Sequence, residues 1–310
     1  MTWYAQTHNL QRPVMLTSLP FSSTFFGGST LEGMPNSSHA RPERHEIAVG
    51  ATLRHYLTIP GANPTGDLLV WLHGSTQSGT VARRFTNHTF DAFAQTGTTV
   101  VYPEGIAHHW NDSRRDLGEK TRQLGTDDVA FLRLLIEAFS PNRVIVAGYS
   151  NGGQMVIRLL HEAPGLIDAA GIFAATQPVP DNFLSSVTGW KPTPIFLMHG
   201  TVDPLSPFHG GHNTRGDITS FSDTVDYYAR LNHAVLADVT ALPHSLEQTV
   251  AIARYTGLAP IEAWALHGVG HVVPCGKEFP ERFLGPSTTM FLAAEKFAQF
   301  CGLDYPIPQG

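Results

Sequence analysis

Short apolar runs alternate with amphipathic segments along the chain from about residue 46 onward. The short runs predict strands, and the segments that repeat apolar residues at helical spacing predict helices. The predicted strands cover residues 46–49, 52–59, 68–72, 98–101, 143–146, 169–174, 194–198 and 261–266, and the first two form a hairpin around Gly50. The predicted helices cover residues 82–95, 127–139, a segment starting near Gly152, 222–231 and 290–300.

Strands and helices that follow one another in this order predict an α/β fold, with a mostly parallel central sheet and helices on both faces. We expect residues 46–310 to form one such domain. Residues 1–45 read as an N-terminal extension, because prolines interrupt the segment and no periodicity is sustained. Its aromatic side chains are expected to pack on the domain, since a free tail rarely carries so many: Trp3, Phe21, Phe25 and Phe26.

Two helix ends carry recognisable signals. Thr126 can cap the helix over 127–139, and Asp127 and Asp128 suit its positive end. Gly302 is expected to end the last helix.

One strand leads directly into a Gly-x-Ser-x-Gly phrase. Residues 144–147 are apolar, and Gly148-Tyr149-Ser150-Asn151-Gly152 follows them. Between a strand and a helix this phrase is typical of a nucleophile elbow, a sharp turn that raises the serine hydroxyl above the sheet. A Cβ at either glycine would crowd the turn. The N–H groups of the following helix would face the negative charge that develops there. The sequence therefore predicts Ser150 as a nucleophile.

An aspartate and a histidine follow this serine in the order that such folds use. Asp203 comes just after the strand over 194–198, in a His199-Gly200-Thr201-Val202-Asp203-Pro204 phrase. His271 follows the strand over 261–266, beyond Gly268 and Gly270. A serine needs a histidine to take its proton, and the histidine needs a carboxylate to orient it. Because ligand sites of parallel sheets lie at the carboxyl ends of the strands, we predict a Ser150–Asp203–His271 catalytic triad.

Other residues compete for the roles of acid and base. Asp217, Asp223 and Asp226 lie farther from the strand end than Asp203 does. His267 stands so close to its strand that it cannot swing over the serine, whereas two glycines let a loop carry His271 there.

The loop after residue 72 is expected to supply the oxyanion hole. It reads His73-Gly74-Ser75-Thr76-Gln77, and the backbone N–H of Ser75 or Thr76, together with that of Asn151, would face the developing oxyanion. His73 is predicted to support this loop as a structural residue.

Composition narrows the partners. The 310 residues carry a net charge of −6 and no basic run, so neither nucleic acid nor an anionic membrane surface is an expected partner. No apolar stretch reaches the length of a membrane span. No signal peptide is evident, so we expect a cytoplasmic rather than a secreted protein. Cys275 and Cys301 leave one disulfide or two free thiols open. The histidines show no metal-ligand pattern, so no metal site is predicted.

Several phrases in a fixed order resemble the polyhydroxybutyrate depolymerase and feruloyl esterase group of α/β-hydrolases over about residues 50–301. The phrases are Leu72-His73-Gly74-Ser75-Thr76-Gln77-Ser78-Gly79, Val101-Tyr102-Pro103-Glu104-Gly105, Trp110-Asn111-Asp112, Thr126-Asp127-Asp128-Val129, Gly148-Tyr149-Ser150-Asn151-Gly152-Gly153, the phrase ending in Asp203-Pro204, and Gly270-His271. The resemblance implies a serine carboxylesterase without metal or organic cofactor. The substrate would be a small-molecule or polymeric ester.

The chain departs from that group at three positions. Val273 stands where the group has a tryptophan, Cys275 where it has a glycine, and Ser75 where a cysteine is frequent. Trp110, Trp190 and Phe208 lie in loops predicted at the edge of the site, and pocket lining and ordinary packing are equally good readings of them. Ester hydrolysis is the predicted function. A peptidase or amidase with the same triad, and a non-catalytic binding protein on this scaffold, are the alternatives. The sequence does not give the oligomeric state.

Overall fold

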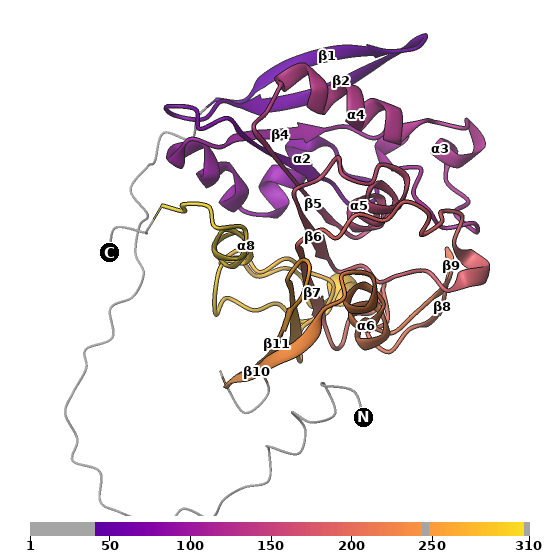
Figure 1. Cartoon of the computed structure of the whole chain (residues 1–310), viewed down its shortest axis with the longest axis vertical. Helices are drawn as coiled ribbons and strands as arrows, with labels where there is room; N and C mark the ends of the chain where they lie inside the picture. Colours follow the sequence, from indigo (N-terminus) through magenta and orange to yellow (C-terminus); the bar gives the residue numbers. More distant parts are fainter. Residues whose placement is uncertain (1–40, 244–247, 307–310) are drawn as a thin grey trace, which may run out of the picture.

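The computed structural model describes residues 41–243 and 248–306, and its centre is a ten-stranded sheet with the strand order β1-β2-β4-β3-β5-β6-β7-β12-β11-β10 (Figure 1). Neighbouring strands from β4 to β12 are parallel to one another. These are β4 (Thr99–Pro103), β3 (Asp67–Leu72), β5 (Arg143–Tyr149), β6 (Ala169–Phe173), β7 (Ile195–Gly200) and β12 (Ile261–His267). The predicted parallel sheet is thereby confirmed.

An antiparallel hairpin lies at each end of the sheet. β1 (Glu43–Val49) pairs with β2 (Thr52–Ile59) around Gly50, as predicted. β1 begins at Glu43, so its first residues fall within the segment assigned to the extension. Residues 1–40 and the predicted packing of their aromatic side chains lie outside the described residues. At the other end, β10 (Val235–Pro243) pairs with β11 (Thr249–Thr256), and neither strand was predicted.

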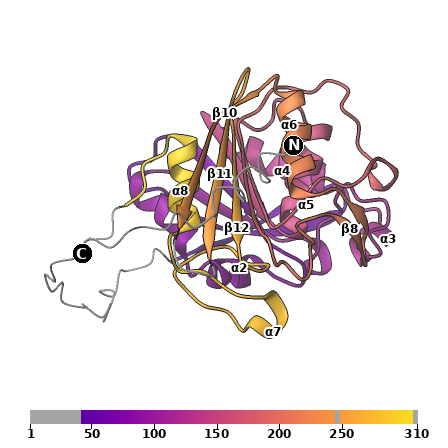
Figure 2. The ribbon, with the colours of Figure 1, turned by 90° about the horizontal axis from the view of Figure 1, so that it is seen from below.

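Helices cover both faces of the sheet, which also agrees with the prediction. On one face α4 (Asp128–Phe139), α5 (Asn151–Glu162) and α6 (Phe221–Leu231) bury their apolar sides in one core cluster. On the other face α2 (Gly79–Phe85), the 3₁₀ helix η2 (Thr89–Thr96) and α8 (Ala293–Cys301) pack in a second cluster. Figure 2 shows α8 and α6 on opposite sides of the sheet. Short elements complete the chain: η3 (Ile106–His108), α3 (Lys120–Gln123), η4 (Pro180–Asn182), β8 (Gly211–Asn213), β9 (Gly216–Ile218) and α7 (Glu281–Leu284).

The prediction of a single helix over residues 82–95 is wrong, because α2 ends at Phe85 and the separate helix η2 follows. Asn87 and His88 take positive φ values of 49° and 59°, and η2 begins at the next residue. Asp91 holds the bend from inside the protein, where it accepts a hydrogen bond from Tyr102 at 2.6 Å and a forked one from Arg83. Tertiary bonds to a buried carboxylate therefore override the local helical pattern.

The cap of α4 also differs from the prediction. Asp127, rather than Thr126, is the N-cap residue, and its carboxylate accepts from the Ala130 N–H at 2.9 Å. Asp128 is buried, pairs with Arg54 at 2.7 Å and accepts the Asn111 N–H. Burial raises the pKa of Asp128, and Arg54 opposes the shift. Asp128 thus ties the loop at Asn111 to the start of α4.

Two further expectations can be compared with the structure. Gly302 ends α8 with a φ of 63°, as predicted. Cys275 and Cys301 are buried free thiols, so the disulfide that the sequence left open is not formed. None of the described helices is long and apolar enough to span a membrane.

Candidate active site

The predicted nucleophile sits on a strained turn between β5 and α5. Ser150 has φ 55° and ψ −116°, a backbone conformation that residues other than glycine seldom adopt. A Cβ at Gly148 would lie 2.4 Å from the backbone of Gly152, and one at Gly152 would lie 2.1 Å from the Leu72 carbonyl oxygen. The two glycines therefore let β5, α5 and β3 approach closely enough to present the serine at the sheet edge.

The structure brings Ser150, His271 and Asp203 together. His271 Nε2 lies 2.9 Å from Ser150 Oγ, and His271 Nδ1 lies 2.6 Å from Asp203 Oδ2. Asp203 follows β7 and His271 follows β12, and these strands are parallel neighbours, so their carboxyl ends meet. With Nδ1–H donating to the carboxylate, the Nε2 lone pair is left to accept from the serine hydroxyl. His267, the rival base, stays within β12.

Asp203 is buried and held in its ionised form. Its Oδ1 accepts from the N–H groups of Leu205 and Ser206 at 2.8 and 2.7 Å, and its Oδ2 lies 3.3 Å from the buried His199 Nε2. Burial by itself raises the pKa of this carboxyl, but the interactions with His271 and His199 outweigh burial. The pKa of Asp203 therefore lies well below its ordinary value. Sequence reasoning gave His199 no role, although it stands at the end of the same strand.

Glycines and a tyrosine fix the loop that carries the histidine. A Cβ at Gly270 would lie 2.0 Å from the Leu284 carbonyl oxygen, so only glycine permits this approach. The Tyr149 hydroxyl donates to the His271 carbonyl at 2.7 Å. Tyr149, the residue before Ser150, thus anchors the backbone of His271.

The loop after β3 offers one of the two oxyanion donors that the sequence proposed there. The Thr76 N–H already donates to the His108 carbonyl at 2.9 Å, so the expectation for Thr76 is wrong. The Ser75 N–H makes no backbone hydrogen bond within residues 41–243 and 248–306. Asn151 is the first residue of α5, so its N–H has no acceptor inside the helix. Ser75 and Asn151 therefore remain as candidate donors.

His73 supports this loop, as expected. Its Nε2 accepts the Gly105 N–H at 2.9 Å, and its Nδ1 donates to the Gly74 carbonyl at 2.8 Å. Burial lowers its pKa to about 4, so the ring is neutral near neutral pH.

The Asn151 side chain has a second function that the sequence did not reveal. Its Oδ1 accepts the Trp110 N–H at 2.7 Å, and its Nδ2 donates to Asp112 Oδ2 at 2.6 Å. This side chain ties the start of α5 to the loop over 110–112. The residue after Ser150 is therefore held in place by its side chain.

A cavity of about 550 Å³ opens above Ser150. The three aromatic residues considered for its wall do not line it. Trp110 is fully buried, with its indole N–H donating to the His73 carbonyl. Trp190 bonds to Asn232, and Phe208 is buried against Phe221. All three side chains serve packing, because the backbone turns them toward the core.

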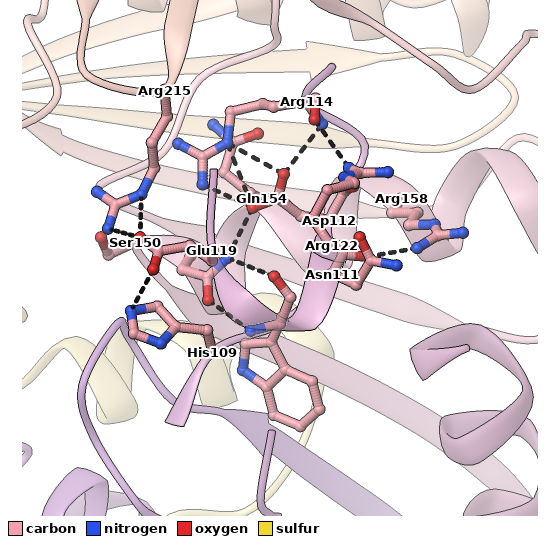
Figure 3. A network of polar contacts seen from close by, with 12 residues as sticks. His109, Asn111, Asp112, Arg114, Glu119, Arg122, Ser150, Gln154, Arg158 and Arg215 are labelled. Atoms are coloured by element: carbon pink, nitrogen blue, oxygen red, sulfur yellow. Dashed lines mark hydrogen bonds and ion pairs between the residues drawn. The ribbon is translucent and has the colours of Figure 1, made fainter. Parts of the chain in front are cut away.

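Residues that the sequence analysis did not single out line the cavity instead. They include Gln154, Arg114, Arg215, Asn213, Val81, Phe85, Leu205, Phe283 and Leu284. Figure 3 shows Arg114 and Arg215, each bonded to a carboxylate, in the same view as Ser150. Within the described ranges, no three His, Cys, Asp or Glu side chains group as metal ligands would.

Comparison with known proteins agrees with this fold. A family model described as "Phospholipase/Carboxylesterase" matches residues 131–244, which include Ser150 and Asp203. The chain is 27% identical over 279 residues to a protein named "Putative esterase NocK" from Nocardia uniformis subsp. tsuyamanensis, which covers 81% of this chain and 79% of that protein. The acetyl xylan esterase from Aspergillus awamori superposes with a TM-score of 0.54 at 14% identity, over 84% of this chain and 99% of that one. The predicted α/β-hydrolase fold is confirmed.

Proposed function

Since this chain is an ester hydrolase with the α/β-hydrolase fold, we propose that Ser150, His271 and Asp203 hydrolyse a carboxylic ester through a covalent acyl-enzyme. The observation that carries the proposal is the continuous pair of hydrogen bonds, 2.9 Å from hydroxyl to imidazole and 2.6 Å from imidazole to carboxylate. Such a relay makes a serine hydroxyl nucleophilic near neutral pH.

The reaction begins when His271 Nε2 takes the proton of Ser150 as Oγ attacks the ester carbonyl carbon. The carbonyl oxygen becomes an oxyanion and accepts from the N–H groups of Ser75 and Asn151. His271 then protonates the departing alcohol, and the acyl group remains on Oγ. A water that gives its proton to His271 attacks the acyl carbon, and His271 returns this proton to Ser150 Oγ as the acid is released. Throughout, ionised Asp203 stabilises the positively charged imidazole.

A small-molecule ester fits this site. The cavity of about 550 Å³ lies within the range of pockets that enclose small ligands. The ordered phrases shared with the polyhydroxybutyrate depolymerase and feruloyl esterase group support a relationship to that group. Val273, at the position of the group's tryptophan, is fully buried in the second core cluster. An aromatic substrate wall is therefore not built at this position.

Paired assays separate ester from amide hydrolysis. We expect turnover of para-nitrophenyl acetate and none detectable above background for an aminoacyl para-nitroanilide, because nothing in the triad favours the poorer amine leaving group. The measurement is initial rate against enzyme concentration for both compounds. A larger kcat/KM for the anilide would replace this proposal with a peptidase or amidase.

The pH dependence of the reaction follows from the state of the two partners. The pKa of Asp203 lies well below its ordinary value, so this carboxylate stays charged through the mildly acidic range. A protonated imidazole cannot accept the serine proton, so kcat/KM should fall as the pH is lowered while Asp203 stays charged. The measurement is kcat/KM for a neutral ester across the pH range. A rate that stays constant down to about pH 4 would argue against a histidine base.

A further inference from the structure

One wall of the cavity carries two arginines that the triad chemistry does not use. Arg114 and Arg215 line the same cavity as Ser150. Neither side chain contacts the triad, and neither has a part in the acyl transfer described above. Asp112 and Glu119 each pair with one of the two guanidinium groups, so the wall is built of oriented, charge-paired side chains.

Arg114 is held rigidly. Its Nε and Nη2 form a fork on Asp112, with Nη2 at 2.6 Å from Oδ2, and its side chain is only 7% exposed. The same Asp112 oxygen accepts from Asn151, the residue after the nucleophile. The guanidinium is therefore fixed relative to the reacting serine through two hydrogen bonds.

Arg215 is oriented in the same way from a different segment. It lies between β8 and β9, and its Nε and Nη2 donate to Glu119 Oε1 at 3.1 and 2.6 Å. Asn182 fixes the backbone of this turn by donating to the Arg215 carbonyl at 3.1 Å. The Arg215 side chain is 30% exposed, so it is open to solvent and to a ligand. Figure 3 shows Arg215 with Glu119 near Ser150.

Both arginines keep part of their binding capacity. Each engages its carboxylate through the Nε and Nη2 edge, and in the described part of the chain neither Nη1 has a hydrogen-bond partner. A guanidinium has five N–H donors, so an edge is left for a second acceptor. Two arginines with a free edge in one cavity suit a carboxylate, which is planar and accepts forked hydrogen bonds.

The opposite side of the cavity is apolar and lies beside the histidine. Leu284 and Phe283 belong to α7, and the His271 N–H donates to the Leu284 carbonyl. Phe283 is 64% exposed, which leaves its ring available to a ligand. Figure 2 shows α7 and α2 apart from β8, the strand that Arg215 follows. Because His271 protonates the leaving alcohol, the alcohol part of a bound ester lies on the side of His271 and α7.

We propose that Arg114 and Arg215 form a subsite for a carboxylate on the acyl part of the substrate, so that the enzyme prefers esters of dicarboxylic acids to neutral esters. The alcohol part lies against the apolar side. This inference rests on the proposed esterase function and adds the class of substrate.

The test compares two para-nitrophenyl esters of equal length. One is the monoester of adipic acid, which ends in a carboxylate, and the other is the same ester with a neutral primary amide at that end. We expect kcat/KM to be at least about tenfold higher for the anionic ester. Arg215→Gln should lower kcat/KM for the anionic ester by about tenfold more than for the neutral ester. Arg230→Gln, which removes an exposed charge on α6, should keep the wild-type preference.

A binding measurement separates failure of the subsite from failure of the esterase proposal. Ser150→Ala should bind the anionic ester at least about tenfold more tightly than the neutral one in calorimetry, and Ser150→Ala/Arg215→Gln should lose this difference. Equal affinities in Ser150→Ala, or an unchanged preference in Arg215→Gln, would overturn the subsite. Preferential binding without turnover by the wild type would support the subsite and contradict the proposed function alone.

Discussion

Replacing Ser150 with alanine is expected to lower kcat for ester hydrolysis by about a millionfold, the loss typical of removing a nucleophile from a serine triad. Without Oγ no acyl-enzyme can form, and the oxyanion donors and binding contacts alone give only a small residual rate. The fold should persist, because alanine places the same Cβ on the strained turn at φ 55°. The measurement is kcat with para-nitrophenyl acetate, together with the Tm.

Ser75, which lines the same cavity as Ser150, provides a matched control. Ser75→Ala keeps the backbone N–H that is proposed to face the oxyanion, so its kcat should stay within about tenfold of the wild type. If Ser150→Ala retained activity within that same range, the nucleophile would have to be another residue.

Asp203→Asn is expected to reduce kcat by about ten-thousandfold, the second largest effect. An amide cannot stabilise the charged imidazole, and by donating its own N–H it can turn His271 to the tautomer that no longer accepts from the serine. The Leu205 and Ser206 N–H groups can still bond to the side-chain oxygen, so the loop should keep its shape. The measurement is kcat at a fixed pH, with Tm as the check on folding.

Two further variants sharpen this result. Asp223 lies exposed on α6, where it bonds to Ser220, and Asp223→Asn should leave kcat within about twofold of the wild type. The double variant Ser150→Ala/Asp203→Asn should be no less active than Ser150→Ala, because residues that act as one unit are not additive. A loss in Asp223→Asn comparable to that expected for Asp203→Asn would move the acid to another position.

Much of the sheet can be predicted from the sequence, because buried parallel strands read as short apolar runs. The sequence did not predict β10 and β11, the two strands of the second hairpin. β10 carries an irregularity between Leu236 and Asp238 that breaks the alternation of side chains, and its residues Val235 and Leu236 are exposed at the sheet edge. The break between α2 and η2 was not predicted either, because it depends on tertiary bonds to the buried carboxylate of Asp91.

The parts of the site that the sequence identified are those set by backbone geometry. The elbow around Ser150 and the glycine beside His271 have a local signature, because a close approach of chains demands glycine there. The residues that line the cavity have no such local signature in the sequence. Trp110 and Arg114 lie in the same loop, yet one turns into the core and the other into the cavity. Only the three-dimensional arrangement decides which way each side chain points.

The most direct measurement is labelling with a fluorophosphonate, followed by mass spectrometry of the intact protein and of its peptides. The proposed relay predicts one adduct per chain, located on Ser150, with loss of esterase activity in proportion to labelling and much slower labelling of Asp203→Asn. An adduct on another residue that abolishes activity, or unlabelled Ser150 in a chain that still turns over esters, would contradict the triad.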